Sequence, residues 1–237
     1  MRKIFAASAL AVILIFGCIQ GANWQYDRHQ LRHAKNELIK KNSAQAAVSE
    51  TAINIDEFRK YAWRSITFSG HFVPEKEILI RNRYHEGKYG FGVVTLFNSD
   101  SGRVFWVDRG WVIAGKDAQT PPITQPVTDE EILIEARIRV ENIENQISGS
   151  VFAVPGRSQA KLEKWNSQQA VKTEPFYLDL ISSSNPEFTP KAPTPLPEIS
   201  DGPHLAYTFQ WILFAFLVVL AWFLVVREER RAQLEKL

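Results

Sequence analysis

Residues that could bind a cofactor gather at the start of the last apolar segment of this 237-residue chain. Four of them recur at the i, i+3, i+4 and i+7 positions of one helical face: His204, Tyr207, Thr208 and Trp211. Pro203 suits the first turn of such a helix, and the positive end of the helix dipole there favours the neutral imidazole of His204. Neutral imidazole can ligate iron, and the aromatic rings could wall a porphyrin site. An interfacial histidine within an ordinary aromatic belt gives the same pattern.

Gln210 and Arg109 are two further candidates for contacts to a cofactor. Gln210 lies beside the same face, inside an apolar stretch, and could hydrogen-bond to another membrane helix or hold a polar group of a porphyrin. Arg109 could bind a carboxylate bidentately. The more common arrangement is an ion pair with Asp108 or another acid that holds a strand end. The next residue, Gly110, is typical of a turn or bulge, over which Trp111 would pack.

Other potential ligands and nucleophiles form no recognisable catalytic site. His29 and His33 are four residues apart and could pair on a divalent metal, but no third ligand is near in the sequence. A solvated helix face is the simpler interpretation of that pair. Cys18, the single cysteine, lies in an apolar segment and is typical of a small buried residue. The chain has neither a G-x-S-x-G motif nor a phosphate-binding loop, so we predict a protein that is not an enzyme and has no catalytic residues.

The composition excludes several classes of protein. Lys and Arg number 28 and Asp and Glu number 26, a net charge of +2, so no basic surface for nucleic acid is predicted. A single cysteine excludes an intramolecular disulfide framework and a cysteine-ligated zinc or iron–sulfur site. With 7 Trp, 6 Tyr and 15 Phe, the chain can build a folded core rather than remain disordered.

Two apolar segments lie at the ends of the chain. Residues 207–226 contain no charge over 20 positions, which at about 1.5 Å per residue span roughly 30 Å, the thickness of a bilayer core. Residues 4–19 are also uncharged and follow a basic start, the pattern of a membrane anchor or of a cleaved signal peptide. Trp24 and Tyr26 are typical of an interfacial aromatic belt and favour the uncleaved anchor.

The flanking charges predict the orientation of these segments. Arg227, Arg230 and Arg231 follow the second segment, so the positive-inside rule places the C-terminus in the cytoplasm. Two spans then place the N-terminus in the cytoplasm too, and the region between the spans outside it. Another basic group follows the first segment against this rule: Arg28, Arg32 and Lys35. Long translocated domains are largely insensitive to such charges.

The middle of the chain predicts a β domain. Six segments rich in Val, Ile and aromatic residues are separated by turn signals: 65–72, 77–84, 90–97, 103–112, 131–140 and 174–181. Their close spacing favours an antiparallel sheet or a small barrel over alternating βαβ units. A helical stalk is expected over 24–47 and a short helix over 158–169. Six prolines within 185–203 are typical of an extended connector.

The predicted fold is therefore a membrane protein with two transmembrane α-helices bracketing an extracytoplasmic, mainly antiparallel β (α+β) domain. Its parts are an N-terminal transmembrane anchor (1–23), a stalk helix (24–50), the mainly-β domain (51–184), a Pro-rich connector (185–203), a C-terminal transmembrane helix (204–226) and a cytoplasmic tail (227–237). No internal repeat divides the chain further.

Four motifs, in order along the chain, resemble the Surfeit locus (Surf/Shy) family of cytochrome c oxidase assembly proteins. They are Trp24-Gln25-x-x-Arg28, Gly70-His71-Phe72, the block 90–96 with Val107-Asp108-Arg109-Gly110-Trp111-Val112, and Gly202-Pro203-His204-Leu205-Ala206-Tyr207 with Gln210-Trp211. The resemblance covers nearly the whole chain. It departs from the family pattern where Leu96 replaces a proline and Asp108 replaces an asparagine.

The resemblance implies a bacterial inner-membrane protein with a periplasmic domain that assists the assembly of cytochrome c oxidase. Bacterial members resemble heme a chaperones, and the family histidine implicated in iron ligation corresponds to His204. The other candidate heme-binding residues are Tyr207, Gln210, Trp211 and Arg109. The implied partners are the oxidase subunits and the heme a synthase. The alternative is a cofactor-free scaffold that grips oxidase subunits or the synthase through the stalk helix and exposed aromatics such as Trp106 or Trp111.

Overall fold

The computed structural model describes residues 2–117, 120–140 and 161–234. The chain forms two compact units. The helical unit comprises residues 1–37 and 198–237, and the sheet unit comprises residues 38–197. Positions 158–160 of the expected short helix lie outside the described residues, and the rest of it forms α2, Lys161–Gln169.

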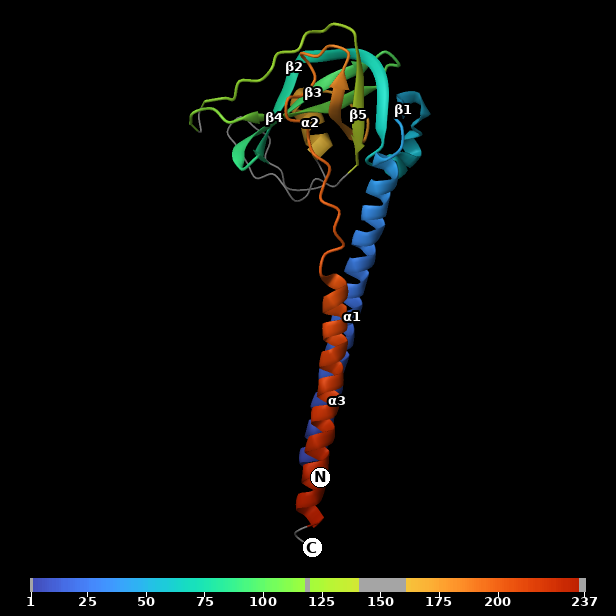
Figure 1. Ribbon diagram of the computed structural model, residues 1–237, viewed down its shortest axis with the longest axis vertical. Helices are drawn as coiled ribbons and strands as arrows, with labels where there is room; N and C mark the ends of the chain where they lie inside the picture. The colour runs from blue at the N-terminus through green and yellow to red at the C-terminus, as the bar shows by residue number, and fades with distance from the viewer. Residues whose placement is uncertain (1, 118–119, 141–160, 235–237) are drawn as a thin grey trace. The chain divides into compact units, whose positions relative to one another are not determined.

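The helical unit consists of α3, His204–Leu234, and most of α1, Arg2–Ser43, which run antiparallel and side by side (Figure 1). Lys3 Nζ near the start of α1 lies 3.2 Å from Glu229 Oε1 near the end of α3. Between them, Trp222 Nε1 donates to Ser8 Oγ at 2.9 Å. The expected helix over 24–47 is confirmed as a continuation of α1, although it ends at Ser43.

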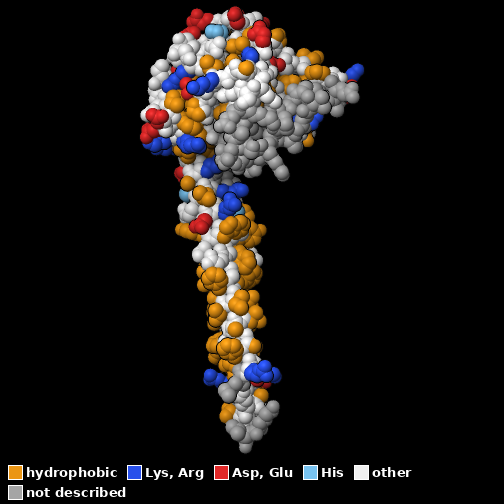
Figure 2. Space-filling model, turned by 180° about the vertical axis from the view of Figure 1, so that it is seen from behind, with side chains coloured by type: hydrophobic (Ala, Val, Ile, Leu, Met, Phe, Trp, Pro, Cys, Tyr) orange, Lys and Arg blue, Asp and Glu red, His pale blue; other side chains and the backbone are white. Residues whose placement is uncertain are grey.

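Both helices are long and apolar enough to cross a membrane. Figure 2 shows apolar side chains gathered along the helical unit, with charged groups at either end of the apolar stretch. Large residues stand out from both helices, among them Phe5 at 78% exposure and Phe209 at 64%. Length and composition therefore fit the two predicted spans.

In the described part of the sheet unit, six strands form one sheet in the order β1-β2-β3-β4-β6-β5. They are β1 (Val48–Ser49), β2 (Ser65–His85), β3 (Lys88–Ser99), β4 (Val104–Ile113), β5 (Ile132–Arg139) and β6 (Tyr177–Ser183). Pairing of β2 with β5 closes the sheet into a barrel. The β1–β2 and β4–β6 pairs are parallel and the other pairs antiparallel, which confirms the predicted mainly antiparallel β domain.

The closure depends on β2, because this strand has two long partners. Residues 65–70 of β2 pair with β5, and the strand pairs with β3 from Gly70 onward. Gly70 therefore has a neighbouring strand on each side. A Cβ at this position would overlap the carbonyl oxygen of Asn98 in β3, so the close approach of the two strands requires glycine.

The prediction of separate strands at 65–72 and 77–84 is wrong, because both belong to β2. Pro74 lies between them and cannot donate to a ladder. It falls in a register shift between Val73 and Glu77, where β2 has residues without a partner in β3. At such a bulge the missing donor costs no pairing, and the strand continues through it.

Apolar residues pack on both faces of the barrel wall. The larger cluster takes residues from β2 to β6, including Phe72, Phe97, Phe105, Ile134 and Phe176. On the opposite face, Trp165 of α2 packs edge-on against Trp106 and Tyr177, with ring centroids 6.1 and 6.0 Å away. Trp106 is completely buried there, so the expectation that it is exposed for a partner is wrong.

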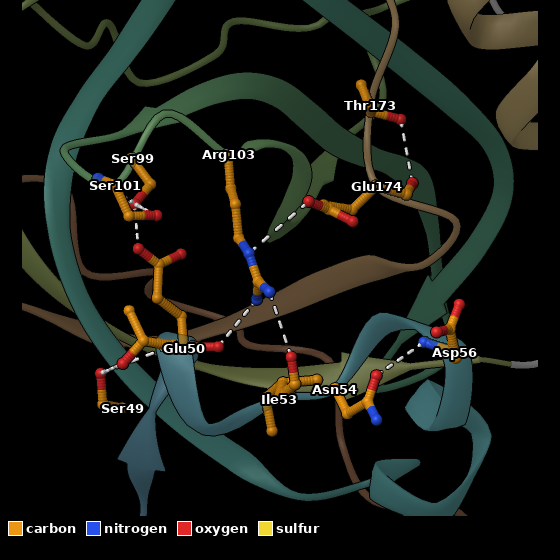
Figure 3. A network of polar contacts seen from close by, with 11 residues as sticks. Ser49, Glu50, Ile53, Asn54, Asp56, Ser99, Ser101, Arg103, Thr173 and Glu174 are labelled. Atoms are coloured by element: carbon orange, nitrogen blue, oxygen red, sulfur yellow. Dashed lines mark hydrogen bonds and ion pairs between the residues drawn. The ribbon is translucent and has the colours of Figure 1, made fainter.

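A polar network fixes the segment between α1 and β2 to the barrel (Figure 3). That segment contains two short 3₁₀ helices, η1 (Glu50–Ala52) and η2 (Ile55–Tyr61). Arg103 donates to the carbonyl oxygens of Glu50 and Ile53 at 2.7 and 3.1 Å, and its Nε lies 3.7 Å from Glu174 Oε1. The Glu50 carboxylate accepts from Ser99. These charged groups have structural partners, so the network stabilises the fold.

Asp108 and Asp179 lie side by side, because they are register partners on the parallel strands β4 and β6. Each is only 1% exposed. Arg83 donates to Asp108 at 2.7 Å, and Arg139 donates to Asp179 at 2.6 Å. Burial raises the pKa of Asp179 to about 6, with a smaller raising contribution from Asp108 and an opposing one from Arg139.

We predict that Asp179→Asn alters the pH dependence of stability. The unfolded carboxyl loses its proton near pH 3.9 and the folded one near pH 6, so raising the pH between these values favours unfolding. The wild type should therefore lose about 2–3 kcal/mol of unfolding free energy over this range, and Asp179→Asn should not. Chemical denaturation at pH 4 to 8 measures the difference. Asp100→Asn, at an exposed turn, is the control, and parallel wild-type and Asp179→Asn profiles would contradict the prediction.

Gly110 occupies a bulge in β4, as predicted, where the register with β3 shifts. Its φ is +96°, a conformation that favours glycine. A Cβ would overlap the carbonyl oxygen of Ala192, which accepts from the backbone N–H of Trp111 at 2.9 Å. The ring of Trp111 packs over Gly90, not over the bulge.

We predict that Gly110→Ala destabilises the sheet unit by about 2–4 kcal/mol, because backbone strain and overlap with Ala192 add. Gly87→Ala is a matched control: its φ is +75°, but nothing lies within 4 Å of a Cβ there. It should cost only about 1–2 kcal/mol of strain. Denaturant unfolding followed by tryptophan fluorescence measures both variants, and equal losses would contradict the role given to crowding.

Candidate functional site

His204 is the first residue of α3, and its ring contacts α1. Nδ1 of His204 lies 2.8 Å from Oε1 of Gln25. An amide oxygen only accepts, so Nδ1 carries the hydrogen and donates it. In the neutral ring the lone pair is then on Nε2, and this is the form that binds a metal. A carbonyl oxygen behind the ring is also the usual partner of a metal-binding histidine, because it fixes the tautomer and the ring orientation.

Asp201, just before α3, makes a second contact to α1. It accepts from His33 Nδ1 at 3.0 Å and from Asn36 Nδ2 at 2.7 Å. These hydrogen bonds lower the pKa of Asp201. The rings of His29 and His33 stack with centroids 6.0 Å apart. His33 therefore serves a helix contact, and among the described residues no three potential ligands form a metal site.

The contact face of α1 follows helical spacing. Gln25, His33 and Asn36 lie on it; Gln25 contacts the first residue of α3, and the other two contact Asp201 just before that helix. The neighbouring face of α1 lines a groove of about 410 Å³ together with His204. Its α1 residues are Trp24, Arg28, Leu31, Arg32 and Lys35. This volume lies within the range of small-molecule sites.

The predicted face of α3 is only partly free. Thr208 is buried and donates to the carbonyl oxygen of His204 at 3.0 Å. The ring of Trp211 packs on Gly21 of α1, where a Cβ would lie 2.7 Å from it. Tyr207 is 45% exposed. Gln210 is exposed, and its side chain forms no hydrogen bond with any residue that the structure describes. The polar contacts between the helices instead come from Gln25, from Trp222 and from the Lys3–Glu229 pair.

Arg109 belongs to the sheet unit, whereas the four other candidate residues belong to the helical unit. It is 8% exposed. Its guanidinium donates to Glu77 at 3.1 Å, to Thr95 at 3.3 Å and to the carbonyl oxygen of Gln125. Its neighbour Asp108 pairs with Arg83 instead. The structure therefore supports the structural interpretation, with Glu77 as the acid.

We predict that Gly21→Leu weakens the pairing of α1 with α3, because a larger side chain must displace the Trp211 ring. The cost should be about 1–3 kcal/mol, seen as a fall of several degrees in the unfolding midpoint of the detergent-solubilised protein. Gly17→Leu is the matched control, since nothing lies within 4 Å of a Cβ at Gly17. Equal midpoints for the two variants would contradict the close packing.

A model of the SURF1 family matches residues 12–216, which is most of the chain. The chain belongs to the SURF1 family. SURF1-like proteins of Mycobacterium tuberculosis and Mycobacterium bovis are 31% identical to it over 160 residues, 65% of this chain and 56% of theirs. The chain thus spans little more than half the length of these relatives. A SURF1-like protein of Rickettsia bellii is 25% identical over 203 residues, 81% of each chain.

The predicted family resemblance is confirmed by this match. SURF1 is known as a family of cytochrome c oxidase assembly factors and is not an enzyme family. Two of the motifs of this SURF1 chain meet at the groove, because Trp24 and Arg28 of the first motif line it together with His204 of the last. Gln25 was not among the predicted site residues, although its place in the Trp24-Gln25-x-x-Arg28 motif was the available signal.

Proposed function

We propose that this SURF1 protein is a membrane-bound assembly factor that holds heme a through His204 and delivers it to the large subunit of cytochrome c oxidase. The observation that carries the proposal is the hydrogen bond from His204 Nδ1 to Gln25 Oε1. It orients the imidazole and leaves Nε2 able to ligate iron. The groove beside the ring has apolar walls at Trp24 and Leu31, which suit the face of a porphyrin.

In this proposal α1 and α3 span the inner membrane of a bacterium, both termini are cytoplasmic and the sheet unit is periplasmic. The length and apolar surface of the two helices support it. Arg227, Arg230 and Arg231 after the apolar part of α3 support the orientation. His204, at the other end of α3, would then lie at the outer interface. There a bound heme a is cargo, and the protein itself catalyses no reaction.

The chain's own residues position this cargo. Gln25 fixes the tautomer of His204. Trp211 packs on Gly21 of α1, and Thr208 hydrogen-bonds to the His204 carbonyl within the first turn of α3. Tyr207 and Gln210 remain exposed on α3 and available for contacts to the porphyrin. Arg109 takes no part, because its guanidinium is committed within the sheet unit.

A cofactor-free scaffold is the second candidate, and one observation favours it. Tyr84 at the end of β2 is 69% exposed and Ile113 at the end of β4 is 59% exposed. Tyr84 pairs with Tyr89, and Ile113 pairs with Gly90. Both partners lie at the start of β3, so the two exposed residues are at the same end of that strand. Exposed apolar residues of this kind suit contact with an oxidase subunit or the heme a synthase. Trp111 is only half-buried beside them.

We predict that the full-length protein, purified in mild detergent from cells that make heme a, shows an a-type band in its reduced-minus-oxidised spectrum. His204→Ala should abolish the band, because it removes the iron ligand. Gln25→Leu should reduce heme content several-fold, because the hydrogen-bond partner of a metal-binding histidine typically contributes about 10–100-fold in affinity. Gln25→Glu keeps an acceptor for Nδ1 and should retain the band.

His71→Ala, in β2 of the sheet unit, is the matched control and should leave the spectrum unchanged. The spectrum of the wild type could instead be flat, while oxidase subunits co-purify even with His204→Ala. That result would contradict the heme chaperone and support the cofactor-free scaffold. A band that survives His204→Ala would assign the iron to another ligand.

A further inference from the structure

The groove beside His204 is lined by several basic side chains. Three of its lining residues are basic, Arg28, Arg32 and Lys35, and they follow one another at i, i+4 and i+7 on α1. The guanidinium of Arg28 lies 5.7 Å from the ring centroid of Trp24, a cation–π contact at the groove wall. Arg32 lies against Gly202, with Nη1 3.4 Å from a Cβ built there.

No acid neutralises these two arginines within the described residues of the helical unit. Asp201 is the acid at the start of α3, but its carboxylate accepts from His33 and Asn36 on the neighbouring face of α1. Neither Arg28 nor Arg32 forms an ion pair with any residue that the structure describes. The amino end of α3 adds a positive partial charge to the same groove. The site is therefore built to receive an anion.

The rest of the groove selects the kind of anion. Trp24 and Leu31 give it an apolar wall, and the His204 ring closes one side. A ligand that satisfies all three features has a flat apolar body, a metal for the imidazole and carboxylates for the guanidinium groups. Arginine matches a carboxylate with two parallel N–H donors. A heme carries two such carboxylates, its propionates.

We propose that Arg28 and Arg32 bind the propionate carboxylates of the heme held on His204. This inference rests on the proposed function, and it assigns to these residues the carboxylate contact that Arg109 cannot make. It also gives the basic group after the first apolar segment a binding role, although the positive-inside rule disfavours basic residues there.

The test compares iron protoporphyrin IX with its dimethyl ester, which has the same iron and ring but no carboxylate charge. Both are titrated into the full-length protein in a zwitterionic detergent, and the affinity is read from the Soret band. The wild type should bind the diacid about five- to tenfold more tightly than the diester, since exposed charge pairs add only modestly to affinity. In Arg28→Gln/Arg32→Gln this preference should vanish, while the affinity for the diester stays unchanged.

Lys41→Gln/Arg59→Gln removes two exposed charges from the sheet unit and should keep the preference. The Soret position reports ligation by His204 separately, so the two proposals can fail separately. If no heme binds to the wild type, the proposed function fails. If heme binds through His204 but diacid and diester bind equally well to the wild type, the propionate site alone is overturned.

Two further results would overturn the assignment of Arg28 and Arg32. An equal loss of both ligands in Arg28→Gln/Arg32→Gln would mean that these residues maintain the shape of the groove. A preference for the diacid that survives the substitution, while phosphatidylglycerol co-purified with the protein falls, would mean that the arginines bind a lipid headgroup.

Discussion

The pairing of α1 with α3 is the constraint on which the candidate site depends. Gln25 and His204 are 179 positions apart, and no local preference of either helix brings them together. Three contacts between the helices set their relative register. They are the ion pair of Lys3 with Glu229, the hydrogen bond from Trp222 to Ser8, and the close packing of Trp211 on Gly21. Because the helices are rigid, these contacts along the pair fix which residue of α1 faces the imidazole. The tautomer of His204 is thus a consequence of helix register.

The sheet unit buries charged side chains within a closed barrel. Its barrel has β2 paired on both sides, so the long strands leave few unpaired edges. The outer wall carries Asp108 and Asp179 in contact range of arginines. Buried charges of this kind seldom add net stability, because desolvation offsets their attraction. Instead, the Asp108 pair joins β4 to β2 and the Asp179 pair joins β6 to β5, since each carboxylate accepts only where its arginine reaches.

The sequence was sufficient to predict elements governed by local pattern and insufficient for those governed by distant partners. The two apolar helices and the mainly antiparallel β domain follow from periodicity and were predicted. The continuity of β2 was not, because Pro74 suggests a break unless the bulge opposite β3 is known. For Arg109 both a carboxylate contact to a cofactor and a structural ion pair were considered; the structure pairs it with Glu77 from another strand, whereas adjacency in sequence had pointed to Asp108. His204 was predicted from the family motif and its place at the start of a helix, whereas the contact of Gln25 depends on the opposite helix.

Some of the family motifs maintain the barrel of the sheet unit, and others form the contact between α1 and α3. In the sheet unit, Gly70 and Gly110 occupy positions where a side chain would overlap a carbonyl oxygen, so they maintain the barrel whatever the protein binds. In the helical unit, Gln25 and His204 are polar residues at a helix contact, where an apolar pair would serve packing equally well. Packing alone therefore does not account for the amide behind the imidazole. A chain that needed only a scaffold could dispense with the Gln25–His204 bond and keep its barrel, so the substitutions that separate binding from assembly belong in α1 and α3.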